Sequence, residues 1–185
     1  MNIMSIKKDN VIKVATKLFA EKGFENTSIA NICSVANVSK GLVYHHFESK
    51  ESILIAIFTQ TTDQMIEMNM ETKKLIAPNI QLQQLIETIF TQLHQNKHLY
   101  QFNLNIMFQP STKKILSEQI ERRANILFNS VKNIFDQISQ ERSTMLTYIF
   151  IAEIDGIALN YLSVFNKYPI EMIKQELLNK YKNIK

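Results

Sequence analysis

Glycine, proline, cysteine and tryptophan are scarce in this chain of 185 residues, which holds three glycines, three prolines, one cysteine and no tryptophan. β-Sandwiches and β-barrels contain many turns, which are rich in glycine and proline. The scarcity of both residues therefore disfavours a β-rich architecture. The single cysteine, Cys33, excludes a disulfide framework or a cysteine-rich zinc site within one chain. No apolar run reaches membrane-spanning length, and the N-terminus lacks a secretory signal. We therefore expect a cytoplasmic protein that does not associate with membranes.

Arginine is also rare, with its three copies at positions 122, 123 and 142. Lysine carries the positive charge instead, and residues 1–50 hold seven lysines against four acidic residues, within an overall net charge of +4. This excess indicates where an anionic partner would bind, although a merely solvated surface is the simpler explanation of charge alone.

Apolar residues recur at helical spacing through most of the chain, and 45% of the residues are apolar. The first helix is predicted to end at Gly23. Three helices should follow, opening near residues 28, 39 and 49, and the last of them should run to about Ile76 before Pro78 stops it. Further patterns cover 79–95, 98–108, 112–138, 142–165 and 170–183. The fold is therefore predicted to be all-α with about nine helices, divided into residues 1–48 and 49–185.

Residues 27–47 contain a cap, a short amphipathic helix, a turn at Asn37, a second cap and a helix of about two turns. This order is typical of a helix-turn-helix. At about 100° per residue, one face of the second helix is polar and the other is apolar. The polar face holds Lys40, Gly41, Tyr44 and His45, whereas Leu42 and Val43 point toward Ile32, Val35 and Val38. A glycine in this face would let a phosphate or a base edge approach the backbone.

Residues 9–54 resemble the DNA-binding domain of the TetR family of bacterial transcriptional regulators. The matching residues are Phe19, Gly23-Phe24, Thr27-Ser28-Ile29, Val38-Ser39-Lys40-Gly41, Tyr44, His46-Phe47 and Ser49-Lys50-Glu51. Two positions depart from the family: Asn37 replaces the usual glycine, and Ala30 stands where many members carry an arginine near DNA.

The resemblance implies a homodimer that places each third helix in a major groove and responds to a ligand in the larger domain. It assigns phosphate-contacting caps to Thr27 and Ser39, the base-facing set to Lys40, Gly41 and Tyr44, and flanking backbone contacts to His45, His46 and Lys50. Arginine paired with guanine is the commonest specific base contact, and this domain has no arginine. We therefore expect readout through Lys40, Tyr44 and DNA shape.

A small lipophilic effector is expected in the larger domain, because methionine and aromatic side chains suit an adaptable apolar pocket. The candidate lining is Met65, Met68, Phe90, Phe102, Met107, Phe108, Phe128 and Tyr148, each of which would also serve as ordinary core. Glu153 stands among apolar neighbours and needs a partner. That partner would be Arg122 or Arg123, or else a cationic effector that Glu153 selects.

The last two helices are predicted to form the dimer interface. Residues 147–162 are apolar on nearly all sides, with Asp155-Gly156 in the middle, and a glycine there would permit close helix approach. The final helix carries an apolar stripe of Ile170, Ile173, Leu177, Tyr181 and Ile184. Two such helices from each subunit would make a four-helix bundle. The alternative is a buried helix within a monomer.

The resulting hypothesis is a repressor that binds a palindromic operator as a dimer and is released by its effector. A helical enzyme is disfavoured, because the sequence shows no nucleophile elbow, phosphate-binding loop or metal-ligand cluster. No catalytic residue, metal or cofactor is expected. A helical protein-interaction module, or an activator without an inducer, remains the alternative.

Overall fold

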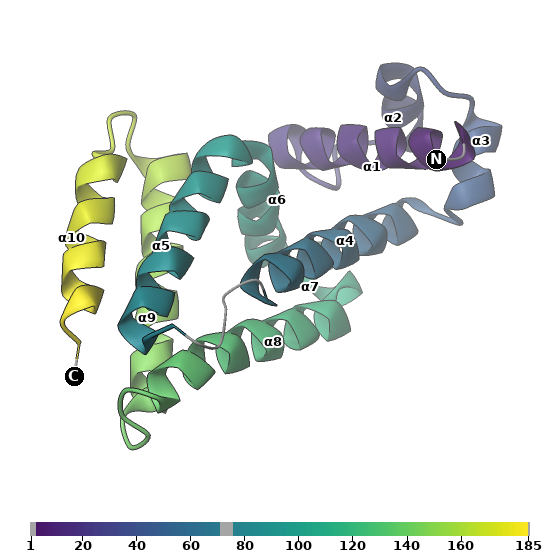
Figure 1. Ribbon diagram of the computed structural model, residues 1–185. Coiled ribbons are helices and arrows are strands. Elements are labelled where there is room, and N and C mark those ends of the chain that lie inside the picture. Colours follow the sequence, from purple (N-terminus) through teal and green to yellow (C-terminus); the bar gives the residue numbers. More distant parts are fainter. Residues whose placement is uncertain (1–2, 71–75, 185) are drawn as a thin grey trace. The chain divides into compact units, whose positions relative to one another are not determined.

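The computed structural model describes residues 3–70 and 76–184, apart from the side chains of residues 3–5, 65, 67–70, 107 and 108. All regular structure in these ranges is helical (Figure 1), which confirms the all-α prediction. The helices are α1 (Ile3–Lys22), α2 (Ile29–Ala36), α3 (Lys40–His46), α4 (Lys50–Met70), α5 (Pro78–Gln95), α6 (Lys97–Phe108), α7 (Pro110–Ile115), α8 (Ser117–Asp136), α9 (Ser143–Leu159), the π-helix η1 (Asn160–Val164) and α10 (Ile170–Lys182).

The chain divides into two compact units that do not follow one another simply along the sequence. The first unit consists of residues 1–62 and 98–120, and the second of residues 63–97 and 121–185. The chain therefore crosses between the units after residues 62, 97 and 120. The functional division at residue 48 stays a prediction.

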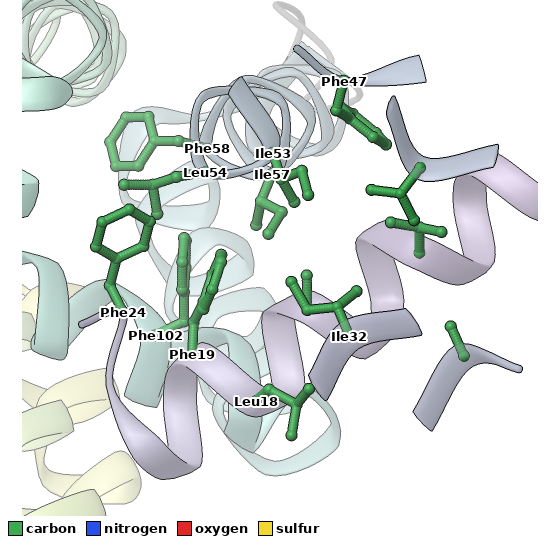
Figure 2. Packing of buried hydrophobic residues seen from close by; sticks show 14 of the residues in the cluster. Leu18, Phe19, Phe24, Ile32, Phe47, Ile53, Leu54, Ile57, Phe58 and Phe102 are labelled. Atoms are coloured by element: carbon green, nitrogen blue, oxygen red, sulfur yellow. The ribbon is translucent and has the colours of Figure 1, made fainter. Parts of the chain in front are cut away.

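The core of the first unit is formed by the apolar faces of α1, α2, α3, α4 and α6. Phe19 of α1, Ile32 of α2 and Val43 of α3 are almost completely buried together. Helix α4 adds Ile53 to the same cluster. Figure 2 shows Phe19, Ile32 and Ile53 in this cluster, with Phe102 of α6 lying beside Phe19. Each fully buried side chain of this size stabilises the fold by about 1.5–3 kcal/mol, so the small N-terminal helices depend on the cluster.

Helix α1 ends at Gly23, as the sequence predicts, and the position needs glycine for two reasons. Gly23 has φ +81°, a left-handed conformation that side chains disfavour. Its N–H donates a 3.0 Å hydrogen bond to the carbonyl of Phe19 and closes the helix. A Cβ atom at this position would also lie only 3.0 Å from Nε2 of Gln109.

The second unit is built around α5, α8, α9 and α10. Helix α10 packs along α5, and Lys174 of α10 forms ion pairs with Glu87 at 3.4 Å and with Glu171 at 3.1 Å. Leu177 and Tyr181 of α10 are buried in this core. The apolar stripe predicted to face a second subunit is therefore covered by the chain's own helices. Periodicity identifies an apolar face but not the surface that covers it.

Two helices differ from the patterns read along the sequence. The segment 112–138 is two helices rather than one, because Leu116 leaves the helical conformation and inserts a completely buried side chain into the first core. The segment 142–165 continues past α9 as the π-helix Asn160–Val164.

One apolar side of helix α9 is not covered by the described residues of the chain. Met145, Tyr148 and Ile149 are 64%, 61% and 41% exposed. The expectation that no apolar run reaches membrane-spanning length is wrong for residues 143–164, which are long enough and have a mean hydropathy of 1.3. In this span, 28% of the residues are buried. Interface and core helices of globular proteins have the same length and composition, so this property alone assigns no membrane.

Candidate nucleic-acid interface

Helix α2 begins at a reciprocal cap formed by Ser28 and Asn31. Ser28 Oγ accepts a 3.1 Å hydrogen bond from the N–H of Asn31, and Asn31 Oδ1 accepts a 3.1 Å bond from the N–H of Ser28. Thr27 is only 1% exposed, and its hydroxyl donates a 2.9 Å bond to the carbonyl of Gly23. The assignment of Thr27 as a phosphate-contacting cap is therefore corrected, because its side chain is buried and Ser28 is the cap.

The turn between α2 and α3 is made by Asn37. Its backbone is left-handed, with φ 54° and ψ 50°, and its N–H donates to the carbonyls of Cys33 and Ser34. Asparagine tolerates this region better than other residues with a Cβ atom. The substitution of asparagine for the family's glycine thus preserves the turn.

Helix α3 exposes the face that the sequence predicts to read DNA. Ser39 begins the helix, and its Oγ accepts a 3.2 Å hydrogen bond from the N–H of Leu42. Val43 is completely buried and anchors the opposite side. The outward side consists of Lys40, Gly41, Tyr44 and His45, all exposed.

Gly41 has no structural reason within the first unit to be glycine. A Cβ atom built on it would meet only Ser39 Oγ, at 3.9 Å. Glycine within a helix costs about 1 kcal/mol relative to alanine. The open space around this position leaves the backbone of α3 accessible to a partner, which is what a close approach to DNA requires.

The side chain of Val35 is exposed, whereas the sequence predicts that it packs against α3. It was expected to pack toward α3, but its side chain is 59% exposed. The buried side of α2 consists instead of Ile32, Cys33 and Ala36.

The two histidines at the end of α3 differ in accessibility. His45 is exposed, whereas His46 is half-buried and its Nε2 is enclosed without a hydrogen-bond partner among the described residues. The two rings meet edge to face at 5.0 Å. His45 can reach a phosphate directly, but Nε2 of His46 cannot do so in this conformation.

Lys50 is tied to the first unit as well as being a candidate phosphate contact. Its Nζ donates a 2.9 Å hydrogen bond to the carbonyl of Phe24 and lies 4.2 Å from the centroid of the Phe24 ring. An ammonium has three donors, so two stay available for an anion. Next to it, the N–H of Glu51 and the hydroxyl of Ser49 lower the pKa of the Glu51 carboxyl. The start of α4 therefore already carries an anion from its own chain.

Lys8 and Asn10 of α1 lie beside the helix-turn-helix and were missed by motif reading. Lys8 Nζ lies 5.8 Å from the ring centroid of Phe47, directly after α3. Asn10 Nδ2 donates a 2.9 Å hydrogen bond to the carbonyl of Ala36, at the end of α2. Their polar positions on a helix with many lysines gave no distinguishing signal.

The predicted effector-binding residues are not gathered into one site by the described contacts. Phe90 is buried in the core of the second unit and Phe102 in the core of the first. Phe128 is half-buried against the exposed Tyr148, with ring centroids 4.8 Å apart. The side chains of Met65, Met68, Met107 and Phe108 lie outside the described residues.

Glu153 has a different partner from either one proposed. One of its carboxylate oxygens pairs with Lys180, and the other accepts a 2.8 Å hydrogen bond from the hydroxyl of Tyr181. Both partners belong to α10. The suggestion that Arg122 or Arg123 neutralises Glu153 is therefore wrong, because the next helix in the chain supplies a cation and a donor. This pairing makes Glu153 a link between α9 and α10.

Comparison with known proteins places this arrangement in a family. Residues 11–57 match the family model described as bacterial regulatory proteins, tetR family. An uncharacterized HTH-type transcriptional regulator of Bacillus subtilis, YuxN, is 26% identical over 86% of this chain. The fatty acid metabolism regulator protein of Bacillus subtilis is 28% identical over 71% of the chain. The matches span 55% and 65% of the lengths of these two relatives.

The structural comparison extends beyond the helix-turn-helix. The Bacillus subtilis transcriptional regulator FadR, solved in complex with stearoyl-CoA, superposes with a TM-score of 0.77. The superposition covers 95% of this chain and 97% of that one at 21% identity, which establishes a shared fold. Residues 11–57, which include the helix-turn-helix, are thus a domain of the tetR family of bacterial regulatory proteins.

Proposed function

We propose that this chain is a ligand-responsive repressor that binds a palindromic operator as a homodimer. The observation that carries the DNA-binding part is the outward side of α3. Lys40, Gly41 and Tyr44 are exposed there, and a Cβ atom at Gly41 would meet only Ser39 Oγ, at 3.9 Å. Lys40 and Tyr44 lie beside the exposed backbone at Gly41, and these side chains are suited to contact base edges and phosphates.

Sequence readout in this proposal depends on few direct contacts. The arginines stand at 122, 123 and 142, so none belongs to α2 or α3. Lys40 would contact guanine or phosphate, and the Tyr44 ring would contact a thymine methyl group. The remaining preference would come from DNA shape, which is read through deformability rather than base contacts.

Dimerisation is supported by the uncovered side of α9. Met145, Tyr148 and Ile149 are exposed on this helix, and Met172 of α10 is 72% exposed. A Cβ atom at Gly156 would meet nothing within 4 Å, so the second unit itself does not require glycine there. A glycine among exposed apolar residues suits a close crossing with the same helix of a second copy. This interface would also explain the apolar composition of α9.

We propose a molecule with a long acyl chain as the effector. The support is the similarity to a fatty acid metabolism regulator and to the FadR protein solved with stearoyl-CoA. The abundance of methionine and phenylalanine in the chain fits such a ligand. Thermal-shift measurements with stearoyl-CoA, free CoA and a sugar phosphate test this part, and stabilisation by stearoyl-CoA alone is the expected result.

The DNA-binding proposal is tested by selecting duplexes from random sequence and measuring affinity against salt concentration. Lys40→Ala and Tyr44→Ala should each weaken binding by about 1–3 kcal/mol per half-site and relax the selected sequence. Lys182→Ala, at an exposed lysine of α10, is the matched control and should leave both unchanged. Failure of the wild type to select any duplex would favour a protein-interaction module instead.

A further inference from the structure

Two asparagine side chains join helix α1 to other parts of the first unit. In the first half of α1, its own Asn10 Nδ2 donates to the carbonyl of Ala36 at 2.9 Å, at the end of α2. Near the end of α1, Asn105 Nδ2 of α6 donates to the carbonyl of Ala20 at 2.7 Å. The ten residues between these points span about 15 Å of helix. Helix α1 therefore connects α6 to the helix-turn-helix through these two hydrogen bonds.

The carbonyl groups at the end of α1 show why Asn105 matters. The last carbonyls of a helix lack partners within it and must find them elsewhere. Phe19 O is satisfied by the N–H of Gly23 at 3.0 Å, and Lys22 O by Asn26 Nδ2 at 3.0 Å. Ala20 O takes its donor from Asn105, which lies 85 residues away in the sequence. The cap of α1 is thus completed by α6.

The surroundings of Asn105 are closely packed. Phe102, on the same helix, is buried in one core with Phe19 (Figure 2), and Ile106 belongs to that core. Gln109 lies against Gly23 so closely that a Cβ atom would contact its Nε2 at 3.0 Å. A shallow hollow beside this contact is lined by residues of the same core, among them Phe19, Phe102 and Ile106.

Helix α6 starts where the chain crosses from the second unit to the first, after residue 97, and the next crossing follows residue 120. Both ends of segment 98–120 therefore continue along the chain into the second unit. Asn105 Nδ2 of this segment donates to Ala20 O at 2.7 Å and also lies 3.4 Å from Phe19 O.

We infer that Asn105 is a positioning residue for DNA recognition, which fixes the orientation of the helix-turn-helix through α1. The inference rests on the proposed function as a dimer on a two-part operator. Asn105 touches no DNA in this scheme, so each recognition motif keeps its own contacts without it. What is lost is the fixed orientation that lets two motifs engage two half-sites at once, because a looser linkage lowers the effective concentration of the second motif.

The test compares two duplexes selected with the wild-type protein, one with both half-sites and one with a single half-site. Asn105→Leu removes the donor and roughly keeps the side chain's shape. It should weaken binding to the complete operator about tenfold and change half-site binding less than twofold. Asn10→Leu, beside the recognition motif, should weaken both. Asn129→Leu, at an exposed asparagine of α8, controls for the substitution itself.

Hydrogen exchange at the end of α1 supplies a second readout that needs no DNA. Asn105→Leu should speed exchange of the Gly23 amide, which closes α1, while the amides of α10 keep wild-type protection. Asn105→His, whose ring N–H can replace the amide donor, should recover part of the operator affinity. Equal losses on both duplexes, or wild-type affinity for both, would overturn the positioning role. A wild-type protein that selects no duplex would overturn the proposed function, whereas a Gly23 amide unchanged in Asn105→Leu would overturn only the cap.

Discussion

The hydroxyl of Tyr181 on α10 donates a 2.8 Å hydrogen bond to the carboxylate of Glu153 on α9. Lys180 pairs with the other oxygen of that carboxylate. Tyr181 is 1% exposed, and its ring packs against those of Phe135 and Phe150, with centroid distances of 6.1 and 5.1 Å. The Tyr181 ring thus belongs to an aromatic cluster, while its hydroxyl joins α10 to α9. These are the two helices proposed to carry the dimer interface.

Breaking this link should lower stability. Tyr181→Phe keeps the ring but removes the donor, and a hydrogen bond to a charged group contributes about 1.5–3 kcal/mol. We expect the thermal midpoint to fall by roughly 3–12 °C, measured by circular dichroism. Glu153→Gln should be destabilising as well, whereas Glu141→Gln, at an exposed glutamate, should change little. Stabilisation of the protein by lipophilic cations that disappears in Glu153→Gln would contradict the structural role.

Alkaline pH should weaken the fold through the same tyrosine. Burial, and then the hydrogen bond and negative charge of Glu153, raise the pKa of Tyr181 well above the ordinary value of 10.0. The folded state therefore holds this proton more tightly than the unfolded state. The contribution to stability is complete below pH 10 and is lost as the pH rises above it. Denaturant titrations between about pH 9 and 11 should show this decline, and Tyr181→Phe should reduce its slope.

Local chemistry made the helix-turn-helix predictable from the sequence. The cap at Ser39 and the left-handed turn at Asn37 depend on residues within a few positions, and both are confirmed. The burial of Thr27 was not predictable in this way. Its hydroxyl has a partner nearby at Gly23, but its enclosure comes from packing of the whole first unit.

Partners distant in the sequence were the main source of error. Glu153 pairs with Lys180, 27 residues away, although arginines were the chemically natural choice. The stripe of α10 was correctly recognised as apolar, yet its covering surface is within the same chain. Periodicity and charge state what a residue needs, whereas tertiary packing decides which of several suitable partners provides it.

Gly41→Ala should separate the stability of the first unit from its DNA affinity. The added methyl group meets only Ser39 Oγ at 3.9 Å, and alanine favours a helix by about 1 kcal/mol. The thermal midpoint should therefore stay the same or rise. Operator affinity, measured by fluorescence anisotropy, should fall at least tenfold because the methyl group blocks close approach. Gln60→Ala, at an exposed site of α4, serves as the control. Wild-type affinity in Gly41→Ala would show that the backbone of α3 does not approach the DNA closely.

The dimer interface should respond to charge on the uncovered side of α9 rather than on the stripe of α10. Ile149 is 41% exposed, so Ile149→Glu leaves the core of the second unit intact but places two like charges in the proposed interface. Light scattering after gel filtration should show a monomer with a nearly unchanged thermal midpoint. Ile80→Glu, at a residue of α5 that is 43% exposed, is the matched control and should remain dimeric.

Gly156→Ala tests whether two α9 helices cross closely at this glycine in the proposed dimer. Apart from the neighbouring backbone of α9, no atom of the described residues lies within 4 Å of the added methyl group, so an isolated subunit should be as stable as the wild type or slightly more so. A close crossing of two α9 helices would not accommodate it, and dimer dissociation should become measurable at lower protein concentrations. Loss of dimerisation in Ile149→Glu without any effect of Gly156→Ala would keep the interface on α9 but move the crossing point away from this glycine. A dimer that survives both changes would place the interface on another surface.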